Sequence, residues 1–152
     1  MKRFFSLRPA TLALALLGTL GLAILLPAAQ AEPFQASGSY VDTHVQPNTT
    51  AGDVTGEATP GGEFVGHYWH RKSFDGPTTA DGRATLDFGN GDTLTIDYLF
   101  VYDEATGLFL GNYVVRRGTG SLKQAIGGGD IAVTFPVQGQ GLIWLDGELF
   151  LD

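Results

Sequence analysis

The sequence contains no cysteine among its 152 residues. This absence excludes disulfide bonds, thiolate metal sites and a cysteine nucleophile. It also removes the acylated cysteine that a bacterial lipoprotein requires. A chain of about 120 residues behind a leader can still bury a hydrophobic core without cross-links. The sequence therefore predicts one soluble domain.

Basic residues are scarce, with nine Lys and Arg against sixteen Asp and Glu. Three of them, Lys2, Arg3 and Arg8, precede the apolar run described next. Without that leader, six basic residues remain and the net charge is about −10. Such a charge repels phosphate backbones and anionic lipid surfaces, so we expect no nucleic-acid partner and no membrane association of the mature form.

Long hydrophobic runs are absent except near the N-terminus, where "TLALALLGTLGLAILL" follows the three basic residues. The following "PAAQA" places the small residues Ala29 and Ala31 around Gln30. This order is typical of a secretory signal peptide, here residues 1–31 cleaved after Ala31. We therefore expect a secreted protein, periplasmic or extracellular, whose folded domain is 32–152. The alternative is an uncleaved membrane anchor, because sixteen apolar residues fall only slightly short of a membrane span.

Helical periodicity is also lacking behind the leader, whereas several segments alternate with period two. The clearest is "DTLTIDYLFVYD", in which Leu94, Ile96, Tyr98, Phe100 and Tyr102 share one face. Polar residues occupy the other face in its first half, which indicates a strand with one face in a core and one in water. The sequence predicts an all-β domain.

The turn signals between these segments predict a single small antiparallel up-and-down β-barrel of about seven or eight strands. We expect strands at 34–45, 63–74, 84–88, 93–102, 108–117, 130–135 and 142–151. Segment 46–62 is loop-like, with room for a short extra strand near Val54. Asn90-Gly91 predicts a two-residue type I′ hairpin, since both residues tolerate positive φ. A two-sheet sandwich is the alternative to the barrel. An outer-membrane barrel is disfavoured because no aromatic girdle is sustained at both strand ends.

The glycine-rich stretch "RRGTGSLKQAIGGGD", residues 116–130, has the composition of a phosphate-binding loop but not its chemistry. A P-loop needs Ser or Thr after its lysine, and Lys123 is followed by Gln124. A dinucleotide fingerprint needs a third glycine where Lys123 stands and a long helix behind it. We therefore interpret the stretch as a turn, about one helical turn and the start of a strand.

The segments "DGRATLDFGNGDTLTIDY" and "TGLFLGNYVVRRGTGSLKQAIGGGDIAVTF" resemble a group of exported bacterial proteins of unknown function. Their arrangement is similar to the allene-oxide-cyclase-like and dirigent-like barrels of the calycin type. The resemblance covers roughly residues 84–152, with Leu122 in place of the usual aromatic residue. The matching residues are turn-makers and imply an architecture rather than a chemistry. They are Asn90, Gly91, Asp92, Gly118, Thr119, Gly120, Ala125 and Gly127.

Catalytic and metal-binding patterns are not found in the sequence. There is no G-x-S-x-G nucleophile elbow. His67 and His70 in "GHYWH" point to opposite faces of a strand and cannot converge on a metal there. We expect no catalytic residues, no metal and no cofactor. Enzymatic activity stays open, although the sequence favours a non-enzymatic protein.

Aromatic residues are abundant for so small a fold, and they supply the candidate site. In one interpretation they fill the barrel, which would then be a structural or interaction protein. In the favoured one, some line an open barrel that binds a small apolar or aromatic ligand or a cell-envelope partner. A third is an isomerase or cyclase acting on a lipid or phenolic substrate. The oligomeric state is left open. The candidate ligand-binding residues are Trp69, Tyr98, Phe100, Tyr102 and Tyr113.

Overall fold

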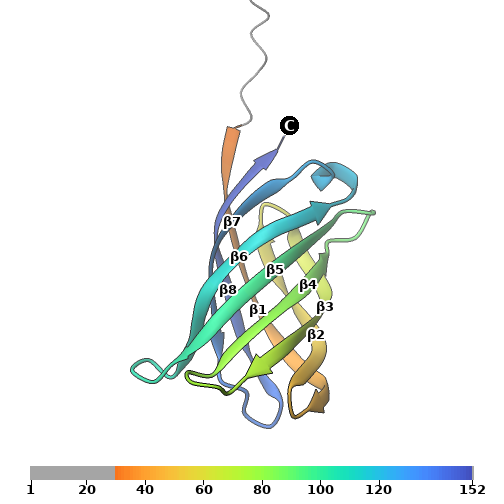
Figure 1. Ribbon diagram of the computed structural model, residues 1–152. Helices are drawn as coiled ribbons and strands as arrows, with labels where there is room; N and C mark the ends of the chain where they lie inside the picture. Colours follow the sequence, from red (N-terminus) through yellow and green to blue (C-terminus); the bar gives the residue numbers. More distant parts are fainter. Residues whose placement is uncertain (1–29, 152) are drawn as a thin grey trace, which may run out of the picture.

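The computed structural model describes residues 30–151, which form a closed antiparallel barrel of eight strands in sequential order (Figure 1). Each strand pairs with the next, and β1 pairs with β8 to close the barrel. The strands are β1 (Gln30–Gln46), β2 (Thr49–Thr59), β3 (Gly62–Ser73), β4 (Thr79–Asp87), β5 (Thr93–Asp103), β6 (Leu108–Gly118), β7 (Ile126–Thr134) and β8 (Gln140–Leu151). The predicted all-β up-and-down barrel is confirmed, and the sandwich alternative is wrong.

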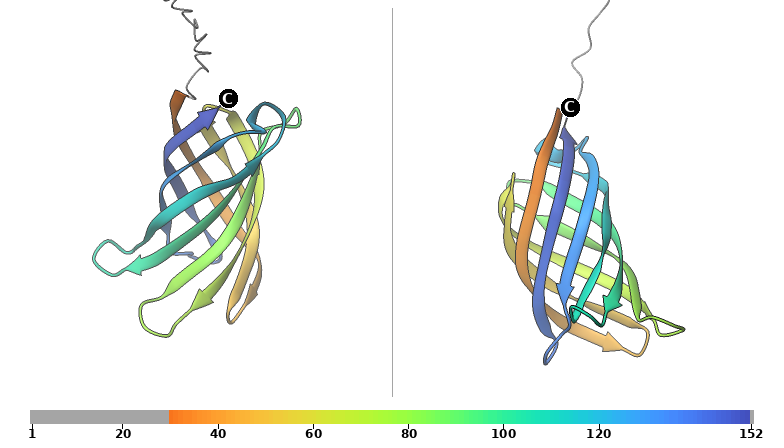
Figure 2. Two further views of the ribbon diagram at one scale, coloured as in Figure 1. Left: turned by 45° about the horizontal axis from the view of Figure 1, so that its top comes forward. Right: turned by 90° about the vertical axis from the view of Figure 1, so that its left-hand side faces the viewer.

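The predicted signal peptide lies outside the described residues, apart from its last two. Gln30 and Ala31 pair with Leu151 and Phe150 at the start of β1, beside the last strand (Figure 2). Export and cleavage after Ala31 therefore stay predictions. Within residues 30–151, no helix is long and apolar enough to span a membrane.

The loop-like interpretation of 46–62 is wrong, because β2 is a full strand in this segment. Its inward positions include Thr50, Gly52 and Val54, which are buried, but only Val54 is strongly apolar. Buried and exposed positions therefore alternate along β2, but apolar and polar residues hardly do. Strand β4 begins at Thr79, five residues before the expected start. For the same reason this start was not predicted, since the first inward residues of β4 are Ala80 and Gly82, which are small.

The inner face of β5 is as predicted. Leu94 and Ile96 are fully buried, Tyr98 and Phe100 are buried, and Tyr102 is half-buried. Thr95, on the opposite face, is also buried, and its hydroxyl lies 3.1 Å from that of Thr85 across the β4–β5 pair. This outward position is therefore covered rather than solvated.

The two ends of the barrel differ. We call "closed end" the end that carries the β2–β3, β4–β5 and β6–β7 connections and the first and last described residues, Gln30 and Leu151; it is uppermost in Figure 1. There the 3-10 helix η1 (Gly120–Leu122) brings Leu122 against the core, and Ala125 is buried beside it. The "mouth end" carries the other four connections. The turn and single helical turn expected in the glycine-rich stretch are thus what closes one end.

The predicted hairpin and the glycine-rich stretch are joined by hydrogen bonds at the closed end. The Asp92 carboxylate accepts the Ser121 amide at 2.7 Å and the Ser121 hydroxyl at 2.8 Å. The Thr119 hydroxyl donates to the Gly91 carbonyl at 2.6 Å. The two hydrogen bonds from Ser121 lower the pKa of the Asp92 carboxyl below its ordinary value.

Asn90 and Gly91 have φ values of 55° and 86°, as the hairpin prediction requires. The connection is one residue longer than predicted. Gly89 also has positive φ, and the Phe88 amide donates to the Asp92 carbonyl, so three residues join the paired positions.

Inward aromatic side chains face inward glycines on the neighbouring strand. A Cβ atom on Gly52 would lie 2.5 Å from the Tyr68 Oη, and one on Gly141 would lie 2.5 Å from the Tyr40 Oη. Glycine is therefore needed at both positions to admit the rings. The cross-strand pairs of this kind are Tyr40–Gly141, Tyr68–Gly52, Tyr98–Gly82, Phe100–Gly111 and Tyr113–Gly129.

Candidate ligand cavity

The barrel encloses a cavity of about 250 Å³. The exposed apolar residues of its lining, Val45, Phe74 and Phe135, all lie at the mouth end, whereas Leu122 and Ala125, which fill the closed end, do not line it. The cavity is therefore a pocket entered from the mouth end. Its deeper wall is almost wholly apolar, with residues from most of the strands: Val54, Phe64, Leu86, Ile96, Phe100 and Ile131 among others.

Polar side chains gather in the part of the cavity nearest the mouth. The Tyr68 hydroxyl donates to Asp42 Oδ1, and the Tyr40 hydroxyl donates to the Thr134 carbonyl at 2.8 Å. His70 Nδ1 lies 3.3 Å from the Tyr98 hydroxyl. We call Tyr40, Asp42, Tyr68, His70 and Tyr98 the polar cluster. Strands β1, β3 and β5, each separated from the next by one strand, position it, because these residues alternate along their inner faces.

The rings of the polar cluster are packed face to face and edge to face. His70 stacks on Tyr68 with ring centroids 5.8 Å apart, and Tyr98 stacks on Phe100 at 5.3 Å. The edge of His70 meets Phe100 at 5.8 Å. Such packing fixes the ring planes and holds the polar atoms in defined places.

Burial keeps most of the polar cluster uncharged. It lowers the pKa of His70 to about 4, so the imidazole is neutral at physiological pH. Burial, reinforced by the nearby Asp42 charge, raises the pKa of Tyr40 to about 12. Burial also raises the pKa of Tyr68 and Tyr98, so all three phenols keep their protons.

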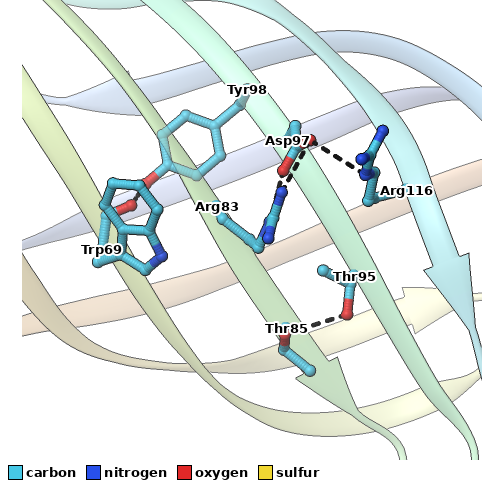
Figure 3. Close-up of polar contacts among 7 residues, drawn as sticks. All are labelled: Trp69, Arg83, Thr85, Thr95, Asp97, Tyr98 and Arg116. Carbon is cyan, nitrogen blue, oxygen red and sulfur yellow. Dashed lines mark hydrogen bonds and ion pairs between the residues drawn. The ribbon is translucent and has the colours of Figure 1, made fainter.

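On the outer face of the barrel, ion pairs join strands β4, β5 and β6 (Figure 3). Arg83 of β4 donates to the Asp97 carboxylate of β5 at 2.6 and 3.2 Å, and Arg116 of β6 lies 3.9 Å from it. The hydrogen bonds from Arg83 lower the pKa of Asp97. Asp97 precedes Tyr98, so these contacts hold together three strands behind the polar cluster.

The five candidate residues from the sequence are not all brought together. Tyr98 and Phe100 line the cavity. Tyr102 is half-buried and packs against Phe109, with ring centroids 5.2 Å apart, but it is not part of the lining. Tyr113 is buried near the closed end against Phe34, and within residues 30–151 its hydroxyl has no hydrogen-bond partner. Trp69 is 49% exposed on the outer face, and only its backbone carbonyl meets the polar cluster, through the Tyr98 hydroxyl at 3.4 Å.

Four members of the polar cluster were not predicted as site residues: Tyr40, Asp42, Tyr68 and His70. The expected opposite orientation of the two histidines is confirmed, since His67 lies outside and contacts Asp53 at 2.5 Å while His70 lines the cavity. The same alternation places Tyr68 and His70 on one face, and an inward histidine two residues from an inward tyrosine was the available signal. Asp42 had no such signal in its own strand.

The arrangement combines an apolar chamber with a few fixed polar atoms near its entrance, which is the usual composition of a small-molecule site. In residues 30–151, no three His, Asp or Glu side chains gather closely enough to hold a metal ion. The fold and this site define a small β-barrel with a cavity of ligand size. Comparison of the chain with protein-family models, with curated proteins and with solved structures found no match.

Proposed function

We propose that this protein binds a small, largely apolar molecule inside its barrel, as a secreted carrier or sensor rather than as an enzyme. The observation that carries the proposal is the cavity of about 250 Å³. The interior of an eight-stranded barrel is just wide enough either to be filled by side chains or to hold one small ligand. Because the interior stays open at the mouth end, it supports a ligand-binding barrel rather than a purely structural one.

The volume limits the ligand. A dry cavity of about 150 Å³ holds one benzene molecule, and sites for drug-sized ligands begin near 300 Å³. The cavity therefore suits a compact molecule of two to three rings, the outermost of which can lie in the open mouth, better than an extended lipid chain. The similarity of residues 84–152 to allene-oxide-cyclase-like and dirigent-like barrels is compatible with this proposal, although its turn residues name no ligand.

The test is binding of N-phenyl-1-naphthylamine, an uncharged dye whose emission rises in apolar surroundings. Ala84 and Ala80 are buried and line the cavity. Ala84→Leu and Ala80→Leu extend side chains into the chamber and are expected to weaken dye binding at least tenfold. Ala132→Leu, on the outer face of β7, is the matched control and should leave it unchanged. Absence of dye binding to the parent protein, or equal binding by all three variants, would contradict the proposal.

An isomerase or cyclase is the second candidate, favoured by the acid–base groups of the polar cluster. Neutral His70 can accept a proton, and so can the Asp42 carboxylate, which already accepts the hydrogen bond of the Tyr68 hydroxyl. Native mass spectrometry of protein from its own host would show which ligand is retained. Prolonged incubation with that ligand then distinguishes the two classes, because only an enzyme converts it into an isomer that chromatography resolves.

A further inference from the structure

The phenolic protons of the polar cluster are all directed to acceptors of the barrel itself. Tyr40 donates to the Thr134 carbonyl, Tyr68 to Asp42 Oδ1 and Tyr98 to the Trp69 carbonyl. A carbonyl or carboxylate oxygen can only accept, so the direction of each bond is fixed. These hydroxyls therefore have no proton left to donate to a ligand.

The two contacts of the Tyr98 hydroxyl favour one tautomer of His70. Both contacts are satisfied only if the Tyr98 proton goes to the Trp69 carbonyl, 3.4 Å away, and the Tyr98 oxygen accepts from His70 Nδ1, 3.3 Å away; donation to Nδ1 would leave the carbonyl contact without a proton. Neutral imidazole carries one N–H, and placing it on Nδ1 leaves Nε2 with a lone pair. His70 makes no other side-chain hydrogen bond within residues 30–151, and its ring lines the cavity.

Asp42 adds a second acceptor. Its Oδ1 accepts from Tyr68, whereas Oδ2 has no hydrogen-bond or ion-pair partner among the described side chains. Lys72 also lines the cavity and is the one cation in its lining. Besides these groups, the lining holds the hydroxyls of Ser37, Thr50, Thr78 and Thr79, which can donate or accept. The groups of the polar cluster offer a ligand acceptors only, at His70 Nε2 and Asp42 Oδ2, and the one cationic donor of the lining is Lys72.

We propose that the cavity selects an uncharged aromatic molecule that carries a hydrogen-bond donor, O–H or N–H, and discriminates against an aromatic carboxylate. The donor is accepted by His70 Nε2 and Asp42 Oδ2, and the ring lies against the apolar wall beside Phe100. This inference rests on the proposed ligand-binding function and names the chemistry that the site recognises. A carboxylate lacks a proton for these acceptors and is repelled by Asp42.

The experiment is a competition series against the dye with four probes of one shape: naphthalene, 2-naphthol, 2-methoxynaphthalene and 2-naphthoate. One added hydrogen bond to a fixed acceptor predicts that 2-naphthol binds roughly tenfold more tightly than naphthalene. 2-Methoxynaphthalene keeps the oxygen but lacks the proton and should lose that advantage. 2-Naphthoate should bind more weakly than naphthalene.

His70→Phe keeps an aromatic ring and removes the acceptor, so the preference for 2-naphthol over naphthalene should fall to about twofold or less while naphthalene still binds. His67→Phe, on the outer face, is the matched control and should keep the preference. Asp42→Asn should relieve the discrimination against 2-naphthoate. Nitrogen-15 chemical shifts of His70 give an independent test, because they distinguish an Nδ1–H tautomer from an Nε2–H tautomer without a ligand.

The outcomes separate this inference from the proposed function. If the dye does not bind the cavity, the proposed function fails. If the dye binds and the leucine variants block it, but 2-naphthoate is the tightest ligand or 2-naphthol shows no preference, the function stands and the inference is overturned. A preference that survives His70→Phe, or an Nε2–H tautomer, overturns the role given to His70.

Discussion

The close approach of Tyr68 to Gly52 leads to a prediction about stability. Replacing Gly52 with alanine adds a Cβ 2.5 Å from the Tyr68 Oη and 2.7 Å from its Cζ, and this atom also overlaps the Val41 carbonyl oxygen. The tyrosine must move, and its hydrogen bond to Asp42 is then lost or distorted. The backbone carbonyl can move only by disturbing the β1–β2 ladder.

Overpacking of this kind costs about 1–3 kcal/mol, and a hydrogen bond to a charged, half-exposed carboxylate adds roughly 1 kcal/mol. We therefore expect Gly52→Ala to lower the free energy of unfolding by about 2–3 kcal/mol, measured by urea denaturation. For a domain of this size the Tm would fall by roughly 10 °C. Gly128→Ala, on the outer face, is the control: the added Cβ would meet a backbone carbonyl oxygen there too, that of Tyr113 at 2.5 Å, but its nearest atoms include no side chain. It should cost clearly less.

A double-mutant cycle identifies the cause. In a Tyr68→Ala background the side-chain overlap is gone and only the overlap with the Val41 carbonyl remains. The cost of Gly52→Ala should then fall by about 1–2 kcal/mol. If Gly52→Ala is as stable as the parent, or costs the same with and without Tyr68, the proposed pairing of ring and glycine does not explain this position.

Three further predictions concern the closed end and the polar cluster. Asp92→Asn should destabilise the protein at neutral pH. Because the folded-state pKa of Asp92 is lowered, its contribution is present above the ordinary pKa and disappears as the pH falls through the lowered value. Equal stability of parent and variant at neutral pH, or a difference that does not shrink in acid, would contradict this. Gly91→Val should cost about 1–3 kcal/mol in denaturant melts, and Gly139→Val a similar amount, since both glycines have positive φ. The pKa of His70 is about 4 in the folded protein and 6.5 in the unfolded chain, so the unfolded chain takes up the proton first as the pH falls. The parent should therefore lose about 1–2 kcal/mol of stability between these values, after allowance for the partial exposure of His70. Urea melts at pH 7 and pH 5 should show this loss in the parent and not in His70→Gln.

The predictability of the strands depended on the size of their inward residues. Strand β5 was predicted within one residue at its C-terminal end because Leu94, Ile96 and Phe100 are large and apolar. Strand β2 was missed because threonine, glycine and alanine occupy most of its inward positions, and hydrophobicity does not distinguish such a strand from a loop. Burial follows from closure of the barrel, which joins strands that are distant in the sequence, β1 and β8 included.

The candidate site was predictable only in part, for a related reason. Tyr98 and Phe100 follow from the alternation within β5. Whether an inward aromatic residue lines a cavity or fills a core depends on its height along the barrel axis, and that height is set by the register of all eight strands. Tyr113 is therefore a core residue near the closed end although its own strand shows the same alternation.

The inward glycines and the cavity have a common physical explanation. Eight strands enclose a narrow interior, and large aromatic side chains directed along the axis would fill it. At Gly52 and Gly141 the missing Cβ leaves room for the ring of Tyr68 or Tyr40 to lie against the wall of the barrel. Each ring then covers backbone rather than occupying the axis, and its hydroxyl reaches across the glycine's strand to an acceptor one strand further on, Asp42 of β1 for Tyr68 and Thr134 of β7 for Tyr40. The same residues that a hydrophobicity pattern treats as gaps in the strands thus keep the mouth half of the barrel open, whereas Leu122 and Ala125 close the opposite end.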